Sequence, residues 1–193
     1  MLGCSEIARP PLILIISIAN TAILRYNNSG DNMKKKSEKA DKTNVMRILE
    51  QHHLPYESHD YSSSGAVSGL DVALALGQEP DRMFKTLVTQ SPSGEHYVFM
   101  VPVSGELDLK KAAKAVGVKS VAMIKSKELL PLTGYIHGGC SPIGMKKPFK
   151  TTIHHTAESY DTIMFSGGRI GCQIEMSLDD LRRVIPVSAA DIV

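Results

Sequence analysis

The apolar residues of this chain occur in short runs that glycine, proline and serine interrupt, and this spacing favours many short strands over a few long elements. Residues 83–88 and 97–101 are two such runs, and the turn residues 91–94 between them predict a β-hairpin. Further strand candidates lie at residues 55–61, 121–124, 135–137, 151–153, 162–165 and 173–176. The sequence therefore predicts an α+β fold in which a mixed sheet curls toward a barrel.

Helix signals lie between the predicted strands and give the sheet its surrounding short helices. Val45, Ile48 and Leu49 share one face of a predicted amphipathic helix within residues 41–53. Three further helices are predicted from their end signals: one after Ser68 and Asp71, which resemble a capping box, one over residues 109–116 between Asp108 and Gly117, and one from Ser177 to Val184. We expect residues 41–193 to form a single domain.

Residues 1–40 differ from the rest of the chain and are interpreted as an anomalous N-terminal extension. Their apolar run, residues 12–18, is well below the roughly 18 residues that a membrane span needs, and the single Arg9 before it makes a weak signal peptide. Met33, followed by three lysines, resembles a bacterial translation start. Our hypothesis is that residues 1–32 are upstream sequence translated in error, or a disordered appendage. We expect a cytoplasmic protein without a membrane segment.

Charge and cysteine content exclude several classes of protein. The chain has 22 Lys and Arg against 20 Asp and Glu, a net charge of +2, which excludes a histone-like cation but allows mild attraction to phosphate. Its three cysteines, Cys4, Cys140 and Cys172, form no CxxC pair, which argues against a disulfide framework and against a thiolate zinc site. The histidine doublets at 52–53 and 154–155 have diverging side chains. The sequence therefore predicts no metal and no cofactor.

Two side chains are candidates for chemistry. Lys85 lies in an apolar strand, on the same face as Met83 and Leu87 because side chains alternate along a strand. This position indicates a cleft in which the ammonium meets a carbonyl or phosphate oxygen, and the alternative is an edge-strand lysine that opposes aggregation. Cys140 follows His137 by three residues, which suggests a thiol nucleophile with its base, and the alternative is a small buried cysteine.

Two glycine-rich loops are candidates for a shared site that holds a small polar ligand. In residues 138–144, adjacent Gly138 and Gly139 leave backbone N–H groups uncovered by side chains. Residues 166–171 place the Ser166 hydroxyl beside a second glycine pair. Neither loop has the pattern of a P-loop or a dinucleotide-binding turn. The alternative for both is an ordinary hairpin turn.

Four collinear motifs together carry a resemblance to a known family. They are Phe84-Lys85-Thr86-Leu87, Gly105-Glu106-Leu107-Asp108-Leu109-Lys110-Lys111, Thr133-Gly134-Tyr135 with Gly138-Gly139-Cys140-Ser141-Pro142-Ile143-Gly144, and Ser166-Gly167-Gly168-Arg169. In this order the chain from about residue 42 resembles the YbaK-type aminoacyl-tRNA deacylases, which are related to the editing domain of prolyl-tRNA synthetase. The resemblance implies a compact mixed α/β domain that removes cysteine from mischarged Cys-tRNA(Pro) in trans.

The resemblance also implies a set of site residues. Catalytic roles are expected for Lys85 and Gly138, and substrate-binding roles for Tyr61, Thr86, Gly139, Ser141, Ser166 and Gln173. One position departs from the family pattern, because a family Asp-Ile-Glu run is here Gln173-Ile174-Glu175. A neutral amide forms hydrogen bonds but cannot act as a base, so the choice of amino acid or the activity could differ in this chain.

The family chemistry needs no nucleophile from the protein. The attacking group in the family is the cysteine thiol of the substrate, which closes on its own ester carbonyl and expels the tRNA. The protein then contributes orientation and stabilisation of the developing oxyanion, for which Lys85 and the N–H groups around Gly138 and Gly139 are candidates.

Three alternatives remain open at this point. The first is a deacylase for another mischarged tRNA, such as Ala-tRNA(Pro), and the second makes Cys140 the nucleophile. The third is a non-catalytic module that binds tRNA or a synthetase, which the basic N-terminal segment and Lys110, Lys111 and Lys114 would support. The expected partners are the acceptor end of an aminoacyl-tRNA and prolyl-tRNA synthetase.

Overall fold

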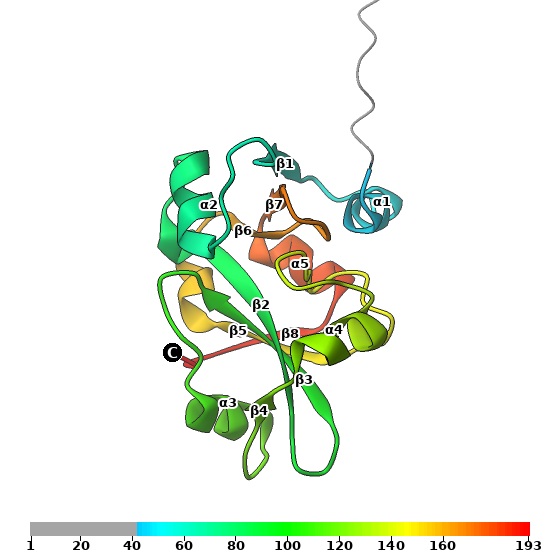
Figure 1. The fold of residues 1–193 in the computed structure, drawn as a ribbon, viewed down its shortest axis with the longest axis vertical. Helices are drawn as coiled ribbons and strands as arrows, with labels where there is room; N and C mark the ends of the chain where they lie inside the picture. The colour runs from blue at the N-terminus through cyan, green and yellow to red at the C-terminus, as the bar shows by residue number, and fades with distance from the viewer. Residues whose placement is uncertain (1–41) are drawn as a thin grey trace, which may run out of the picture. The chain divides into compact units, whose positions relative to one another are not determined.

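Eight strands form one mixed sheet in residues 42–193, the part of the chain that the structure, a computed structural model, describes (Figure 1). The strands are β1 (Glu57–Asp60), β2 (Met83–Gln90), β3 (His96–Pro102), β4 (Ala122–Met123), β5 (Lys150–His154), β6 (Ile163–Ser166), β7 (Cys172–Met176) and β8 (Val187–Ala190). The helices are α1 (Asn44–Gln51), α2 (Gly69–Leu76), α3 (Leu109–Val116), α4 (Ser126–Thr133) and α5 (Leu178–Val184), with 3₁₀ turns η1 (Pro80–Arg82) and η2 (His155–Ser159). Within these residues, none of the helices has both the length and the apolar character that crossing a bilayer requires. The expectations for the apolar run at 12–18, for Met33 and for Cys4 fall outside the described residues.

The strand order combines antiparallel and parallel pairs. It runs β1-β7-β6-β2-β3-β5-β8, with β4 paired to β2 beside this path (Figure 1). β2–β3, β2–β4, β6–β7 and β1–β7 are antiparallel, and β2–β6, β3–β5 and β5–β8 are parallel. β1 and β8 lie at opposite ends of this order, so the described sheet stays open and does not close into a barrel. The predicted α+β class, with a mixed sheet and short surrounding helices, is confirmed.

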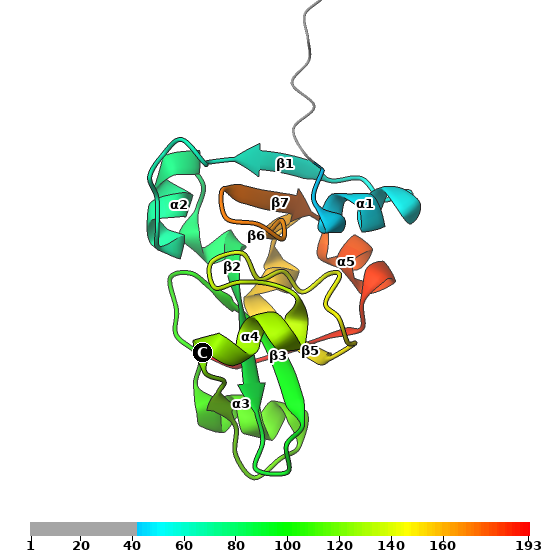
Figure 2. The same ribbon diagram turned by 45° about the vertical axis from the view of Figure 1, so that its right-hand side comes forward.

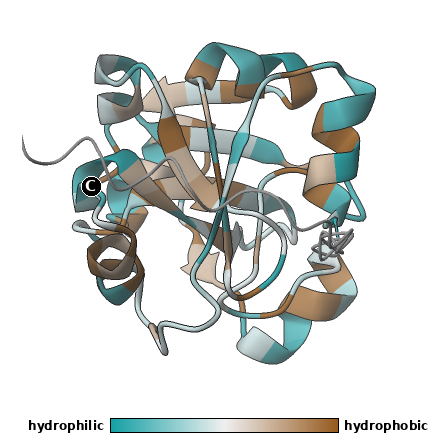
Figure 3. Ribbon diagram, turned by 90° about the horizontal axis from the view of Figure 1, so that it is seen from above, coloured by the Kyte–Doolittle hydropathy of each residue, from teal (hydrophilic) through white to brown (hydrophobic). Residues whose placement is uncertain are grey.

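Side-chain alternation on β3 divides the molecule into layers. Tyr97, Phe99 and Val101 pack with α3 in one apolar cluster, whereas Val98 and Met100 belong to the larger core. That larger core takes its helix contacts from Val45 and Leu49 of α1, Leu129 of α4, and Leu178 and Leu181 of α5. A third cluster packs α2 against β2 and β6. Hydrophobic residues accordingly gather along the strands, and hydrophilic residues on the outer sides of the helices (Figure 3).

Side-chain caps fix several helix ends where the sequence predicts them. Ser68 and Asp71 form a capping box at the start of α2, each side chain bonding the other residue's backbone N–H. The Asp108 carboxylate accepts from two backbone N–H groups in the first turn of α3. α3 ends at Gly117, whose φ of 78° belongs to the left-handed region that favours glycine.

One predicted strand is wrong, and one α-helix and one strand were not predicted. Residues 135–137 lie in an irregular loop, because their backbone groups bond locally and not to another strand: Tyr135 N–H donates to the Thr133 hydroxyl at 3.0 Å, and the Ile136 carbonyl accepts from Gly139 N–H at 3.1 Å. α4 precedes this loop and contains Pro131, a residue that sequence reasoning takes as a helix break. β8 is the second missed element, and it pairs with β5.

Candidate active site

A gap in the strand pairing of β2 creates the site. β6 pairs with Met83 and Phe84 on one edge of β2, and β4 pairs with Thr89 and Gln90 on the same edge. Between them, residues 85–87 have no strand partner on that edge among the described residues. The sheet therefore opens at this point, and a pocket occupies the opening.

The backbone of Thr86 points into this opening. The Val88 carbonyl accepts from Ile124 N–H at 3.3 Å on the open edge, whereas the Met83 carbonyl accepts from Val103 N–H at 2.8 Å on the opposite edge. Because successive residues of a strand direct their N–H and C=O groups to alternate edges, Thr86 shares the direction of Val88. A ligand in the gap therefore meets the main chain of Thr86.

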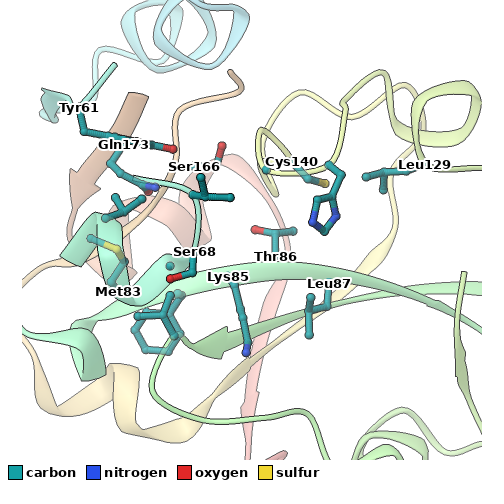
Figure 4. A pocket seen from close by; sticks show the side chains of 17 residues that line it. Tyr61, Ser68, Met83, Lys85, Thr86, Leu87, Leu129, Cys140, Ser166 and Gln173 are labelled. Atoms are coloured by element: carbon teal, nitrogen blue, oxygen red, sulfur yellow. The ribbon is translucent and has the colours of Figure 1, made fainter. Parts of the chain in front are cut away.

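The pocket has a volume of about 250 Å³, and α2, β2, α4, β6, β7 and the loop after α4 supply its wall (Figure 4). Its lining comprises Tyr61, Val67, Ser68, Gly69, Val72, Met83, Phe84, Lys85, Thr86, Leu87, Val103, Leu129, His137, Gly138, Cys140, Ser166 and Gln173. Six of the eight predicted site residues are in this set. Gly139 and Ser141 are not.

Two polar atoms of the wall lack hydrogen-bond partners. Thr86 Oγ1 and Gln173 Oε1 are buried, and neither has a partner among the described residues. Figure 4 shows Thr86, Ser166 and Gln173 on the same side of β2. A buried polar atom without a partner costs about 1–3 kcal/mol, which a ligand donor at this place would recover.

Ser166 and Tyr61 are held in the wall by local hydrogen bonds. The Ser166 hydroxyl accepts from Gly168 N–H at 3.3 Å, which closes the turn that begins the second glycine-rich loop. The Tyr61 backbone N–H donates to the Gly171 carbonyl at 2.8 Å, so this loop also positions the tyrosine. Both side chains are less than a tenth exposed.

Lys85 lines the pocket, but its ammonium is engaged elsewhere. Lys85 Nζ lies 2.8 Å from Glu106 Oε1, in a pair whose lysine side chain is 28% exposed and whose glutamate is 90% exposed. Figure 4 shows the Lys85 side chain leaving β2 on the side opposite to Thr86. Joint action of this ammonium with Gly138 requires Lys85 to leave Glu106, so the catalytic role of Lys85 stays a prediction.

Gly138 and Gly139 have different structural roles. Gly138 is exposed, lines the pocket and has a φ of 82°, and its N–H makes no hydrogen bond within residues 42–193. Gly139 donates its N–H to the Ile136 carbonyl at 3.1 Å, so that donor is occupied. A side chain at Gly139 would approach the backbone of Arg169 at 3.2 Å, which indicates that this glycine allows the two glycine-rich loops to touch.

Ser141 lies behind the wall. Its side chain is fully buried, and its hydroxyl accepts from Ile143 N–H at 3.4 Å. It therefore supports the loop rather than contributing a surface to the pocket.

Burial governs the chemistry of the two described cysteines. Cys140 is 7% exposed, and burial raises the pKa of its thiol to about 12, against a smaller opposing effect of the Thr133 hydroxyl. Burial likewise raises the pKa of the Cys172 thiol. Both are free thiols, and Cys140 alone of the two lines the pocket. A thiol with such a pKa is almost entirely protonated at neutral pH, which disfavours Cys140 as a nucleophile.

A first cluster of possible metal ligands comprises His154, His155 and Asp191. Lys111 Nζ already lies 3.0 Å from the Asp191 carboxylate, and Ile192 N–H donates to His154 Nδ1 at 3.3 Å. These contacts already engage the Asp191 carboxylate and one ring nitrogen of His154, and none of the three residues lines the pocket.

A second cluster comprises Glu57, His59 and Glu175. Glu175 pairs with Arg82, accepts from the Thr162 hydroxyl at 2.6 Å and lies 2.8 Å from His59 Nε2. Burial opposes ionisation of Glu175, but the hydrogen bond from Thr162 and the charge of Arg82 outweigh it and lower the pKa of this carboxyl. Arg82 therefore supplies the positive charge here, and these contacts join β1, β7 and η1 with Thr162, the residue before β6.

Several wall residues were not singled out as site residues from the sequence. Val67, Gly69 and Leu129 gave no chemical signal, and His137 was considered only as a partner of Cys140. Ser68 did give a signal, the capping box, but that signal reports a helix start and not a pocket.

Comparison with known proteins identifies the family. The aminoacyl-tRNA editing domain family matches residues 65–184, which contain every wall residue except Tyr61. The chain belongs to this family. The resemblance inferred from the sequence motifs, to a family of aminoacyl-tRNA deacylases, is confirmed.

Comparison with individual relatives of this editing-domain chain agrees with the family assignment. The chain is 48% identical over 145 residues, 75% of this chain and 87% of the relative, to EbsC of Enterococcus faecalis, provisionally named a Cys-tRNA(Pro)/Cys-tRNA(Cys) deacylase. It is 35% identical over 77 residues to a proline–tRNA ligase of Pelobacter propionicus, covering 40% of this chain but 13% of that enzyme. A crystal structure provisionally described as a trans-editing enzyme for prolyl-tRNA synthetase is 26% identical, with a TM-score of 0.66 over 77% of this chain and 93% of that one.

Proposed function

We propose that this chain is a trans-editing deacylase that removes cysteine from mischarged Cys-tRNA(Pro). The observation that carries the proposal is the 48% identity to EbsC, which extends over 87% of a protein whose name gives this activity. The activity belongs to residues 41–193 in this proposal. Prolyl-tRNA synthetase is the proposed partner that supplies the choice of tRNA.

The size and polarity of the pocket support an aminoacyl substrate. Its volume of about 250 Å³ is below the roughly 300–1,000 Å³ of sites for drug-sized ligands, and it suits a group the size of one amino acid. Gln173 Oε1 and Thr86 Oγ1 can accept hydrogen bonds from the α-ammonium of the substrate. The free N–H of Gly138 can donate to the ester carbonyl oxygen as negative charge develops on it.

The proposed reaction uses the thiol of the substrate. Its sulfur attacks the ester carbonyl carbon, the new S–C bond closes a thiolactone, and the C–O bond to the terminal ribose breaks. The thiol proton ends on the ribose oxygen, so the products are tRNA with a free hydroxyl and a cyclic cysteine thiolactone. The high pKa of Cys140 supports a reaction without a protein nucleophile. Lys85, once released from Glu106, is the proposed anchor of the substrate.

A panel of charged tRNAs tests this function. We expect the full chain to release cysteine from Cys-tRNA(Pro) and to spare Ala-tRNA(Pro). The matched control is tRNA(Pro) charged with S-methylcysteine, which keeps the ester and the side-chain sulfur but has no free thiol, and it should resist deacylation. Release of alanine or of S-methylcysteine at a similar rate would refute the thiol mechanism. Binding of Cys-tRNA(Pro) without any loss of the ester would favour the non-catalytic module.

A further inference from the structure

The pocket reaches the surface between two rims, and the chain segments that contribute these rims, residues 66–82 and 125–147, differ in the sign of their charge. Val67 and Ser68 are exposed wall residues on the α2 side, and His137 and Gly138 are exposed wall residues on the loop after α4. Residues 66–82 on the first rim carry three acidic residues and one arginine, and that arginine is paired with Glu175. Residues 125–147 on the second rim carry four lysines and one glutamate.

The lysines of the second rim are exposed and available. Lys125, Lys127, Lys146 and Lys147 are all exposed, and within residues 42–193 no carboxylate lies within ion-pair distance of them. Lys146 is fixed near the end of α4, where its Nζ lies 3.4 Å from two helix carbonyl oxygens, those of Leu130 and Pro131. We name the surface formed by these four lysines the α4 face.

Exposed apolar side chains lie next to the wall residues His137 and Gly138. Ile136 is 51% exposed and precedes the wall residues His137 and Gly138 in the chain. Ile170 is 56% exposed, and its side chain lies about 3.5 Å from the position that a Cβ of Gly138 would take. A nucleobase next to the pocket mouth would cover these two isoleucines, while neighbouring phosphates would meet lysines.

We infer that the acceptor end of the tRNA docks on the α4 face, with Lys127, Lys146 and Lys147 against its phosphates. The inference rests on the proposed function, because an aminoacyl group in the pocket is joined to the terminal nucleotide of the tRNA. Polyanionic RNA favours the basic rim over the acidic one by simple charge complementarity. α4 itself supplies a wall residue, Leu129, so the helix that carries Lys127 borders the pocket.

The other basic helix, α3, is not part of the pocket wall. It lies at the end of the molecule formed by the β2–β3 hairpin (Figure 2). Lys111 is committed to Asp191 and to the Val193 carbonyl, but Lys110 and Lys114 are exposed. These last two lysines therefore provide a matched control with the same charge and exposure.

Two double variants of the full chain test the docking site. Lys127→Glu with Lys147→Glu changes the α4 face, and Lys110→Glu with Lys114→Glu makes the same change in net charge on α3. Binding of uncharged tRNA(Pro) is measured at several salt concentrations. We expect the α4 variant to weaken binding at least about fivefold and to reduce the salt slope by about 1 for each lysine, with little effect of the α3 variant.

A small substrate distinguishes a failure of this inference from a failure of the proposed function. Turnover of 3′-O-cysteinyl-adenosine, which lacks the RNA body, should be equal in the wild type and both variants, whereas the α4 variant alone should lose turnover of Cys-tRNA(Pro). Three results would overturn the docking site: both variants lose tRNA binding equally, the α4 variant loses no tRNA binding, or the wild type binds no tRNA measurably. If the wild type cleaves neither ester, the proposed function fails, and the tRNA-binding measurement still decides the docking site.

Discussion

Cys140 lines the pocket, yet burial gives its thiol a pKa of about 12 and keeps it protonated at neutral pH. A protonated thiol is a poor nucleophile, so its place in the wall is explained by packing. We expect Cys140→Ala to deacylate Cys-tRNA(Pro) within about threefold of the wild-type rate, since no bond to this sulfur forms. The rate under single-turnover conditions is the measurement. A loss of several hundredfold in a folded variant would restore the Cys140 nucleophile.

Lys85 can be separated from its ion-pair partner by mutation. Lys85→Ala removes the ammonium, and we expect turnover of Cys-tRNA(Pro) to fall at least about tenfold if this group anchors substrate. Glu106→Gln is the matched control, because it breaks the same 2.8 Å pair but leaves the ammonium in place. The control should retain activity, and its stability should change by only about 0–1 kcal/mol because the glutamate is 90% exposed. Near wild-type turnover of Lys85→Ala would exclude Lys85 as the anchor.

At the scale of elements, sequence signals predict an element well where local chemistry alone determines it. The Asp108 cap and the Gly117 end predict α3 correctly, and two apolar runs around the turn residues 91–94 predict β2 and β3. α4 was missed because Pro131 suggests a break, although tertiary packing of Leu129 holds the helix together. The gap in β2 could not be predicted, because it depends on where two distant strands stop pairing with the same edge.

The cap of α3 gives a stability prediction without a catalytic component. The Asp108 carboxylate accepts from Lys110 N–H at 2.8 Å and from Lys111 N–H at 3.1 Å, and α3 supplies no wall residue. Asp108→Ala should lower the free energy of unfolding by about 1 kcal/mol and leave turnover unchanged. Asp108→Asn, which can still cap, should lose less. Urea denaturation combined with a deacylation assay measures both, and a change in turnover at constant substrate binding would contradict this separation.

Glu175 links β7 to β1, to η1 and to Thr162, and it gives the stability a pH dependence. Its pKa is lowered in the folded state, so its contribution to stability is complete above its unfolded pKa of about 4.3 and is lost as pH falls through the lower folded value. Glu175→Gln should therefore destabilise by roughly 2 kcal/mol or more at pH 7, because Arg82 loses its partner, and the difference should shrink in acid. Thermal melts from pH 7 to pH 3 measure this difference.

A matched control for that comparison is Glu158→Gln. Glu158 pairs with Arg182 at 2.7 Å, but its side chain is 51% exposed, so the pair should contribute only about 0–1 kcal/mol. If both variants lost equal stability, or if the effect of Glu175→Gln grew in acid, the ion pair of Glu175 with Arg82 would not be the cause.

At the scale of the whole molecule, the family motifs predict which residues share the site better than the chemistry of single residues does. Periodicity suggested a cleft at Lys85, but only the resemblance linked it to Tyr61, Ser166 and Gln173, which arrive from other strands or loops and now share one wall. Residue chemistry could not reveal that Gly139 is a packing glycine, because its N–H is occupied by a turn that forms only after α4.

Domain organisation gives the last prediction. The three apolar clusters of the described residues are built from buried side chains between Val45 and Ile192, within the domain predicted at residues 41–193. We expect a chain of residues 41–193 to melt within about 3 °C of the full chain and to deacylate Cys-tRNA(Pro) at the same rate, since a change of 1 kcal/mol would shift the melting temperature of a domain this size by only about 2–4 °C. The measurement is calorimetry of both chains beside a single-turnover assay. Loss of folding in the shorter chain would show that the N-terminal residues belong to the domain. Loss of tRNA turnover with an unchanged melting temperature would instead assign them a part in binding RNA, and 3′-O-cysteinyl-adenosine would then be cleaved equally by both chains.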